Sequence, residues 1–432
     1  MVTTMGRLTG NTAVVCVAQF VVVLDTTIVT TALPAIGPAL AFPRGDLPWV
    51  ITAYTVVFGA LLVPCGRVAD LLGPRRAFRL GVVLFVGASA ACALAWAPVA
   101  LVVARAVQGA GSALLSPAAL ALLTALTEPG AARRAAVGWW TAAAACGGAS
   151  GWLLGGLLTE WVGWRWVFWV NVPIGLLVLV ARRLPAGTRR RDVSVDIAGA
   201  ALAVAAVGLL VYGLSAPGWV LVPAVAAAAV LVRHLRRTAD PLLPVLRAAA
   251  GANLTALALT AATTPVMYLA TLYLRERLPP ARAALLFPVF NLAVVGASLA
   301  APAVLRVLGA RHTLLAGFAT VAAGTAVFAT LPGAGVPVVQ LVAGFAVLGT
   351  GLGVASVAST HAGTEAADPA HHGVASGALN SSAQLGTALG LALLAPVAAH
   401  YRLGFLGAGV VAVAGMAAGL LVARGTEKLA VG

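Results

Sequence analysis

Two ionisable residues stand inside stretches of the sequence that are otherwise apolar. Asp25 is the one carboxylate placed well inside such a stretch, and Arg105 interrupts another. An ionised group in hydrocarbon is costly unless it faces water or finds a partner, so a residue of this kind first suggests a functional site. A carboxyl group that can take up a proton from either side of a membrane suits proton-coupled chemistry. The plainer alternative for Asp25 is a helix end at the membrane surface.

Arg105 heads a stripe of polar residues on one side of its apolar segment. Gln108 and Ser112 follow at i+3 and i+7, and residues so spaced share one face of an α-helix. Because an arginine keeps its charge in proteins, Arg105 can hold a carboxylate, a backbone carbonyl or an anionic solute. The stripe favours a helix face turned toward a water-filled cavity. A purely structural tie between helices is the alternative.

Other polar side chains within apolar segments are candidates for lining a substrate cavity. Asn380 and Gln384 lie one helical turn apart, where contact with a solute and hydrogen bonding between helices are both open. Weaker candidates of the same kind are Gln19, Tyr54, Asn171, Tyr268 and Asn291.

A short charged segment, residues 66–76, separates two long apolar runs. It contains Gly66, Asp70, Gly73, Arg75 and Arg76. Asp70 can satisfy free N–H groups at the start of the following helix, and the arginines suit the cytosolic face of a membrane. Ordinary topology signals explain the arginines but not the Gly-x3-Asp-x2-Gly spacing. We therefore expect a loop that acts as a conformational latch.

Small residues recur at regular steps in the apolar run around residue 150. Glycines four residues apart let helix backbones approach closely, so this segment is expected to pack tightly against a neighbouring helix. The glycines concerned are Gly147, Gly151, Gly155 and Gly156.

The composition indicates an all-α polytopic membrane protein. Hydrophobic residues make up 61% of the 432 residues and charged residues only 9%, against about 25% charged in soluble domains. The net charge of +15 comes from basic residues in short loops between apolar runs, where the positive-inside rule expects them. Nucleic acid is therefore not an expected partner.

Enzymatic, metal and nucleotide chemistry find no support in the motifs. The four cysteines fall within apolar runs without the spacing of a disulfide framework or a metal site. No Gly-x4-Gly-Lys-Ser/Thr sequence occurs, so ATP is not expected to drive this chain. We expect no cofactor other than a proton gradient.

The hydropathy pattern predicts fourteen membrane spans. With the N-terminus inside, the inside loops hold 20 basic residues and the outside loops 6, a bias that predicts cytoplasmic location of both termini. The expected spans are residues 11–33, 47–65, 79–97, 98–125, 136–158, 163–181, 196–215, 217–233, 252–274, 283–305, 312–331, 336–359, 373–397 and 401–423.

The spans fall into an expected pattern of six, two and six. We predict a six-helix bundle at 1–185, an inserted pair of helices with linkers at 186–245, and a second six-helix bundle at 246–432. Two related bundles around a midplane site are a common plan of transporters. Residues 305–311 lie where a second copy of the 66–76 segment would fall, and they lack its aspartate.

At this point several motifs together resemble one family. Residues 66–78 resemble the loop motif of the major facilitator superfamily, and residues 105–111 resemble its fourth-helix arginine motif. The run Leu24-Asp25-Thr26-Thr27 is similar to the first-helix motif of the fourteen-span drug/proton antiporters of the EmrB/QacA type. Similar matches occur at residues 164–175, 240–244 and 373–380. The family reads Gly-Pro where this chain has Gly151 and Trp152.

The resemblance implies the major facilitator fold and a proton-coupled function. It implies Asp25 and Arg105 as the proton-coupling residues, and the 66–76 segment as the gate. The hypothesis is a monomeric exporter in the bacterial inner membrane that exchanges protons for small amphipathic compounds such as antibiotics. A facilitator or a proton symporter is the alternative, and a non-transporting membrane sensor is a more distant one.

Overall fold

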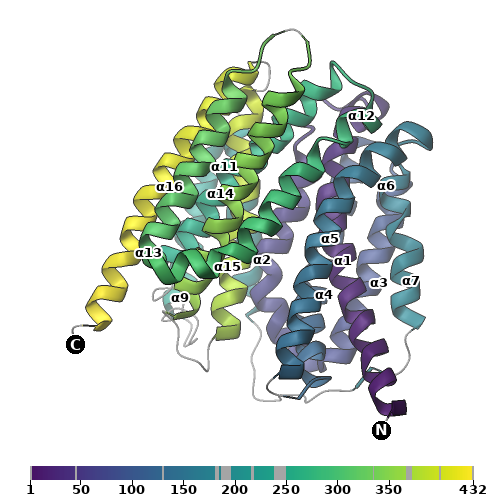
Figure 1. Cartoon of the computed structure of the whole chain (residues 1–432). Coiled ribbons are helices and arrows are strands. Elements are labelled where there is room, and N and C mark those ends of the chain that lie inside the picture. Colours follow the sequence, from purple (N-terminus) through teal and green to yellow (C-terminus); the bar gives the residue numbers. More distant parts are fainter. Residues whose placement is uncertain are drawn as a thin grey trace. The chain divides into compact units, whose positions relative to one another are not determined.

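A computed structural model describes residues 2–43, 46–128, 131–180, 184–185, 196–215, 218–237, 250–333, 335–365, 372–397 and 400–430. Every regular element in these residues is helical (Figure 1). The first part of the chain forms α1 (Val2–Ala39), α2 (Trp49–Leu72), α3 (Pro74–Ala93), α4 (Pro98–Ala125), α5 (Ala131–Trp161), α6 (Trp166–Trp169) and α7 (Asn171–Val180). It continues with α8 (Ile197–Ser215), η1 (Gly218–Val220), α9 (Leu221–Arg237), α11 (Ala250–Arg275), α12 (Pro280–Ala284), α13 (Phe287–Ala329), α14 (Val338–Glu365), α15 (His372–Leu394), η3 (Ala395–Val397) and α16 (Tyr401–Ala430).

The helices have the length and hydropathy of a multi-pass membrane protein. Within the described residues, ten helical stretches are long and apolar enough to cross a membrane. Two shorter apolar stretches are Trp166–Val180 and Leu221–Leu235. One stretch of 50 residues, Pro280–Ala329, covers two of the expected spans. The expected membrane-protein class is confirmed, whereas the count of fourteen spans is not.

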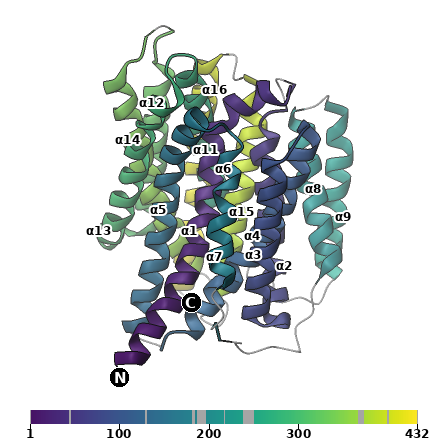
Figure 2. The same ribbon diagram turned by 90° about the vertical axis from the view of Figure 1, so that its right-hand side faces the viewer.

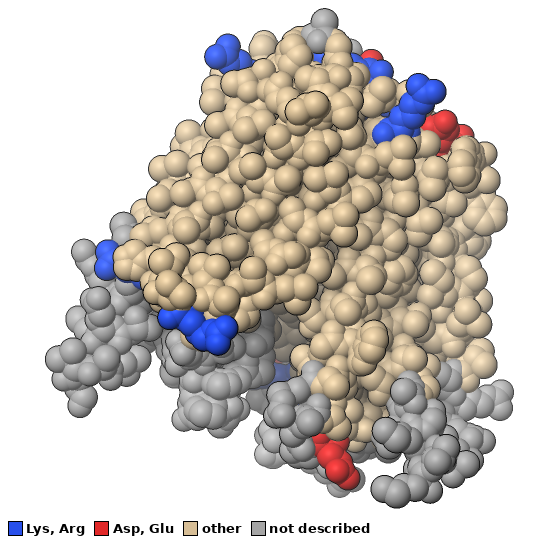
Figure 3. All heavy atoms as spheres, viewed as in Figure 1, with Lys and Arg blue, Asp and Glu red and all other residues tan. Residues whose placement is uncertain are grey.

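The long sides of these helices carry few charged side chains on the face of the molecule that Figure 3 shows. In Figure 3 the visible Lys, Arg, Asp and Glu residues lie near helix ends, and the long sides of the helices show uncharged residues. This distribution fits helices whose middle portions contact hydrocarbon.

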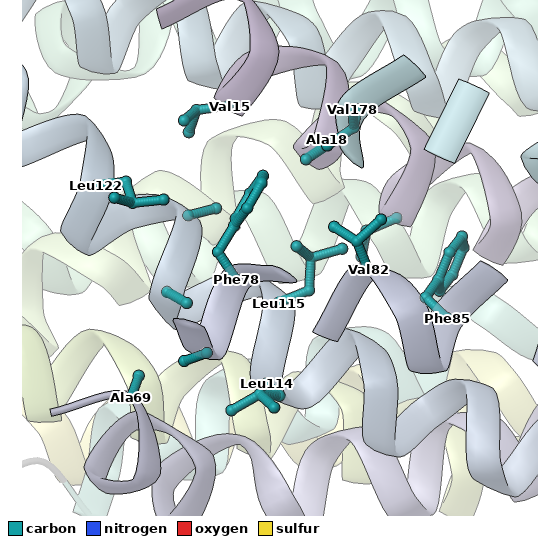
Figure 4. Packing of buried hydrophobic residues seen from close by; sticks show 14 of the residues in the cluster. Val15, Ala18, Ala69, Phe78, Val82, Phe85, Leu114, Leu115, Leu122 and Val178 are labelled. Carbon is teal, nitrogen blue, oxygen red and sulfur yellow. The ribbon is translucent and has the colours of Figure 1, made fainter. Parts of the chain in front are cut away.

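The chain divides into two compact units, Met1–Ala200 and Ala201–Gly432, and each is described by itself. In the first unit, α3 and α4 form the centre of the apolar core (Figure 4). Phe78, Val82 and Phe85 of α3 pack with Leu115 and other residues of α4. In the second unit, α8 and α9 lie side by side (Figure 2), in contact where Gly213 meets Leu221. The predicted division at 185 and 245 stays a prediction.

The 66–76 segment is not a loop, in contrast to the expectation. α2 continues to Leu72 and α3 begins at Pro74, so Asp70 lies in the last turn of α2. Gly73 alone breaks the helix, with φ 85° and ψ 142°. Only glycine takes this conformation readily, and Pro74 is well suited to the first position of the next helix. A single residue therefore makes the turn that eleven were expected to make.

The same turn recurs inside α13. Gly309 has φ 72° and ψ 166°, close to the angles of Gly73, and it divides α13 into two helical halves. This finding agrees with the expected second copy of the 66–76 segment at residues 305–311. The position that corresponds to Asp70, three residues before the glycine, is Arg306.

The expected span 163–181 is interrupted. α6 ends at Trp169 and α7 begins at Asn171. Pro173 has no N–H to donate to the carbonyl group of Trp169, so the helical ladder cannot run continuously through this point. Val170 between α6 and α7 keeps helical angles, with φ −58° and ψ −30°, so the chain does not turn here.

Glycines mark the contact between α1 and α5. A Cβ atom at Gly147 would collide with the carbonyl oxygen of Phe20, and one at Gly151 would lie 2.9 Å from the carbonyl oxygen of Leu24. Gly155 meets the backbone of α1 one turn further on, and Gly156 is also buried. Side chains are excluded here because the two backbones nearly touch.

The contact between α3 and α4 is built in the same way. A Cβ atom at Gly81 would lie 2.7 Å from the backbone nitrogen of Leu115, and one at Gly111 would lie 2.7 Å from that of Phe85. Each helix thus places a glycine against the backbone of its partner, and four positions after its own glycine each helix contacts the glycine of the other.

The second unit repeats this reciprocal contact between the second half of α13 and α14. A Cβ atom at Gly317 would lie 2.9 Å from the nitrogen of Ala355, and one at Gly351 would lie 2.6 Å from that of Val321. The spacing of four residues is the same on both helices. The two units therefore share a packing register, which aligns α4 with α14.

We predict that Gly147→Ala destabilises the protein by about 1–3 kcal/mol, the usual cost of overpacking. Its Cβ atom meets backbone that has little room to retreat. The control is Gly138→Ala in the same helix, where nothing lies within 4 Å and alanine is the better helix former. Thermal unfolding in detergent should show a lower midpoint for Gly147→Ala only. Equal midpoints would contradict the packing described here.

Candidate functional site

Asp25 and Arg105 form a buried ion pair in the first unit. Arg105 Nη1 lies 2.6 Å from Asp25 Oδ2, and the side chains are 1% and 0% exposed. Asp25 belongs to α1 and Arg105 to α4, which places the pair between two helices far apart in the sequence. A buried charge that loses its partner costs several kcal/mol, so removal of either member is expected to destabilise this arrangement.

Gln108 connects both members of the ion pair. Its Oε1 accepts a hydrogen bond from Arg105 Nη1 at 2.6 Å, and its Nε2 donates to Asp25 Oδ1 at 2.8 Å. The same Nε2 donates to Ser89 Oγ at 2.8 Å, and Ser89 in turn donates to the carbonyl oxygen of Phe85. Gln108 lies one turn after Arg105, so the helical stripe seen in the sequence points into the network.

Asn171 supplies a third donor to the carboxylate. Its Nδ2 lies 2.7 Å from Asp25 Oδ1, and its side chain is fully buried. Asn171 is the first residue of α7. Asp25 therefore receives hydrogen bonds at both oxygens, from Arg105, Gln108 and Asn171, and is well stabilised as a carboxylate.

The guanidinium group of Arg105 is enclosed on its other sides. Its Nε donates to the carbonyl oxygen of Val50 at 2.9 Å. The ring of Tyr54 lies against it, with 4.4 Å from Cζ to the ring centroid, and the ring of Phe168 lies 5.8 Å away. Tyr54 donates to Ser112 Oγ at 2.8 Å, which connects Ser112, the last residue of the stripe, to the network. Helices α1, α2, α3, α4, α6 and α7 all contribute to the network.

The network can exist in two charge states that differ in stability. Three donors, one of them carrying the counter-charge, surround the carboxylate of Asp25. Protonation would leave Arg105 without its counter-charge in a place that is 1% exposed. Such a state is unfavourable until the guanidinium reaches water or another partner. A change of charge at either member would therefore destabilise the packing of the helices that contribute to the network.

In the described residues of the second unit, no such network lies at the corresponding positions. A Cβ atom at Gly109 would meet the carbonyl oxygen of Tyr54, and one at Gly349 would meet that of Phe290. This shared register aligns Arg105 with Phe345, since each lies four residues before its glycine.

Phe345 belongs to an aromatic cluster. Its ring lies 5.1 Å from the ring of Phe287 and 5.1 Å from that of Phe328, spacings that are favourable for aromatic pairs. The repeat therefore keeps the backbone packing and replaces the ionic network by aromatic rings.

The remaining cavity candidates lie in different surroundings. Gln19 is buried, and its Oε1 has no hydrogen-bond partner in the described part of the chain. Asn291 Nδ2 also has no partner there. Asn380 lies in the wall of a small cavity of the second unit, and Gln384, half-buried one turn later, is not part of that wall.

The residues expected to gate the protein lie at the junction of α2 and α3, at a distance along the helices from the ion pair. Gly66 and Asp70 belong to the last two turns of α2, and Arg75 and Arg76 to the first turn of α3. Their gating role stays a prediction.

Two contributors escaped the sequence analysis. Ser89 carries no signal in the sequence that distinguishes it from other serines in apolar helices. Phe168 is one of several aromatic residues in its segment, and its contact with Arg105 depends on the fold. Asn171 was only a weak candidate, although its place just before Pro173 could have suggested a helix start inside the membrane.

A comparison with protein-family models gives a match to the Major Facilitator Superfamily over residues 15–391. The match covers most of the chain, from within α1 to within the last turn of α15. The chain belongs to the Major Facilitator Superfamily. It is thus a membrane transporter, and the superfamily resemblance of its motifs is confirmed.

Several relatives are named for antibiotic export or antibiotic resistance. A cephamycin export protein of Amycolatopsis lactamdurans is 37% identical over 93% of this chain and 90% of its own length. A puromycin resistance protein of Streptomyces alboniger is 36% identical over 88% of this chain and 80% of its own length. A lincomycin resistance protein of Streptomyces lincolnensis is 36% identical over 90% and 84% of the two chains.

Solved structures share the fold. The crystal structure of a POT family transporter in complex with 5-aminolevulinic acid superposes with a TM-score of 0.72 over 96% of both chains, at 15% sequence identity. At this identity the likeness concerns the fold alone.

We predict that the ion pair shows strong energetic coupling. Arg105→Leu should destabilise the protein by about 3–5 kcal/mol, because it leaves a buried carboxylate without its counter-charge. Adding Asp25→Leu should recover part of this loss, with a coupling energy of about 1–3 kcal/mol. A double-mutant cycle on unfolding in detergent measures it. Strictly additive losses would show that the two charges do not depend on each other.

Proposed function

We propose that the protein is a proton-coupled exporter of small amphipathic compounds such as antibiotics, a drug/proton antiporter of the fourteen-span type. The superfamily membership supports transport, and the names of the relatives support an antibiotic-like substrate. The observation that carries the proton coupling is the buried Asp25–Arg105 pair, with its 2.6 Å contact and near-zero exposure.

The proposed cycle uses the two charge states of the network. With Asp25 ionised, the pair is closed and the six contributing helices are held together. In the arrangement open to the outside, a proton taken up from the outside at Asp25 ends its attraction to Arg105 and favours release of the compound. The proton leaves to the cytosol when the pair closes again. Arg105 adjusts how readily Asp25 takes the proton and is never itself deprotonated.

Proton entry supplies enough energy for this cycle. One elementary charge that crosses a potential of 100 mV yields about 2.3 kcal/mol, enough for roughly fifty-fold accumulation of a neutral compound. A pH gradient adds to this value. Because the described residues of the second unit carry Phe345 where the first unit carries Arg105, we propose that one network, and hence one proton, serves each cycle.

The proposed topology follows from the arginine distribution. Both termini face the cytosol, and the turns at Gly73 and Gly309 lie on the same, cytosolic side. Asp70, Arg75 and Arg76 then act at this surface as the gate beside Gly66 and Gly73. The protein acts as a monomer in the bacterial cell membrane, and the proton gradient is its energy source.

A facilitator or a proton symporter is a second candidate, favoured by one observation. Trp152 stands where antiporters of this type have proline, and it is a buried residue of α5. Without that proline, α5 keeps its full hydrogen-bond ladder and loses a bend. The direction of proton flow relative to the flow of the compound separates these mechanisms.

The test is proton movement in proteoliposomes. Puromycin, lincomycin and cephamycin are added in turn to vesicles with an acid interior, and a pH-sensitive dye reports proton efflux. We predict that at least one compound triggers efflux, and that Asp25→Asn abolishes it because the amide cannot bind the proton. Asp25→Glu should retain part of it, which shows that a protein altered at this position still folds.

Asp46→Asn is the matched control, since Asp46 is exposed and lies outside the helices. It should behave as the natural protein. Uptake of a compound without proton movement would favour the facilitator, and proton flow in the same direction as the compound would favour the symporter. Unchanged coupling in a folded Asp25→Asn protein would contradict the role of Asp25.

A further inference from the structure

A small cavity lies inside the second unit, among α11, α14 and α15. Its volume is about 250 Å³, somewhat below the range of about 300–1,000 Å³ that holds a whole drug-sized ligand. Half of its ten lining residues carry a hydroxyl or amide group, and the other half are alanine or leucine. This size and mixture suit one polar portion of a larger amphipathic molecule.

The polar side of the cavity offers hydrogen-bonding groups to a ligand. Asn380 is exposed and makes no hydrogen bond with a described residue, so its amide can both donate and accept. Ser356 is likewise exposed on the cavity wall. Thr260 Oγ1 donates to the carbonyl oxygen of Ala383 at 2.6 Å, which leaves the lone pairs of its oxygen for a donor on the ligand.

The polar wall is held in place by bonds between helices. Ser359 Oγ and Thr255 Oγ1 lie 2.8 Å apart, and Ser359 also donates to the carbonyl oxygen of Ala252 at 3.0 Å. These bonds join α14 to α11, while the bond of Thr260 joins α11 to α15. Each wall is therefore fixed relative to the other two, as a preorganised binding site requires.

None of the described residues that line this cavity is ionisable. Leu352 and Leu379 provide the apolar side. A charged group placed here would lose water and gain no counter-charge, which is strongly unfavourable. A neutral group with hydroxyl, carbonyl or amide functions would exchange water for Asn380, Ser356 and Thr260 at little cost.

We propose that this cavity binds an uncharged, hydroxyl- or amide-bearing portion of the exported compound, such as a glycosyl group. The proposal rests on the proposed function, since it names the chemistry by which an exporter would select its substrate. Recognition and proton coupling are then divided between the units: the first carries the buried ion pair, and the second carries a neutral site.

The place of the cavity in its helices fits capture from the cytosol. Its residues lie within about three turns of the start of α11, the end of α14 and the start of α15. These three ends lie on the cytosolic side in the topology proposed above. A compound that enters from the cytosol would thus meet this cavity early.

Binding of three matched probes to the full-length protein in lipid nanodiscs tests the proposal. The probes are a naphthyl β-glucoside, naphthyl sulfate and a naphthylmethyl trimethylammonium salt, which are neutral, anionic and cationic. Equilibrium dialysis should show saturable binding of the glucoside at least tenfold tighter than that of either charged probe. Equal binding of all three, or no saturable binding of the glucoside, would overturn the proposal.

Variants locate the binding. Asn380→Leu should weaken glucoside binding at least fivefold, and Asn380→Asp should instead favour the cationic probe. Thr360→Val should weaken glucoside binding about fivefold, the effect of one net hydrogen bond. Its control is Thr350→Val, because both threonines are exposed on α14 and donate to the carbonyl four residues earlier, but only Thr360 lines the cavity.

The two proposals fail in different ways. Unchanged glucoside binding in the Asn380 and Thr360 variants would overturn the neutral site while leaving proton coupling through Asp25 intact. Glucoside binding that responds to these variants, together with no proton movement for any compound, would keep the site and reject the antiporter.

Discussion

In a buried charge pair inside a membrane protein, each charged atom needs a counter-charge or a hydrogen-bond partner. The first unit is arranged around this constraint. Asp25 has three donors and Arg105 has a carboxylate, an amide oxygen, a backbone carbonyl and an aromatic ring around it. Six helices have to meet around the pair for the whole network to form. The pair is a source of instability whenever its charge balance changes, and this property is what makes it useful to a transporter.

Glycines bring the helices to that point. The reciprocal contact of α3 with α4, and the contact of α1 with α5, allow backbones to approach to distances that any side chain would prevent. The second unit keeps the same register but fills the position of Arg105 with Phe345. One scaffold thus occurs twice in the chain, and the ionic chemistry is placed in only one copy. This asymmetry agrees with a division into a proton-coupling unit and a ligand-binding unit.

Much of this could be predicted from the sequence, for physical reasons that are specific to each element. Long uncharged runs predict membrane helices, and Asp25 and Arg105, each alone in such a run, indicate a candidate site. The contacts of the pair could not be predicted, because Ser89 of α3 reaches Gln108, and Asn171 of α7 reaches Asp25, only through the packing of the fold. The sequence of residues 66–76 predicts a loop because Asp70 and the arginines are typical of exposed surfaces. The structure shows that one residue, Gly73, is enough to turn the backbone between α2 and α3. The interruption of the expected span 163–181 could not be predicted, because the sequence does not show whether Pro173 stands near a helix start or in a helix interior.

The central claim is that Asp25 takes up a proton and that binding of a substrate competes with it. Infrared difference spectroscopy of the purified protein between neutral and acid pH tests this claim directly, through the C=O stretch of a protonated carboxyl group. The account predicts a band in the natural protein that is missing in Asp25→Asn and that decreases when a transported compound is added at constant acid pH. The same band in both proteins, or a band that the compound leaves unchanged, would contradict it.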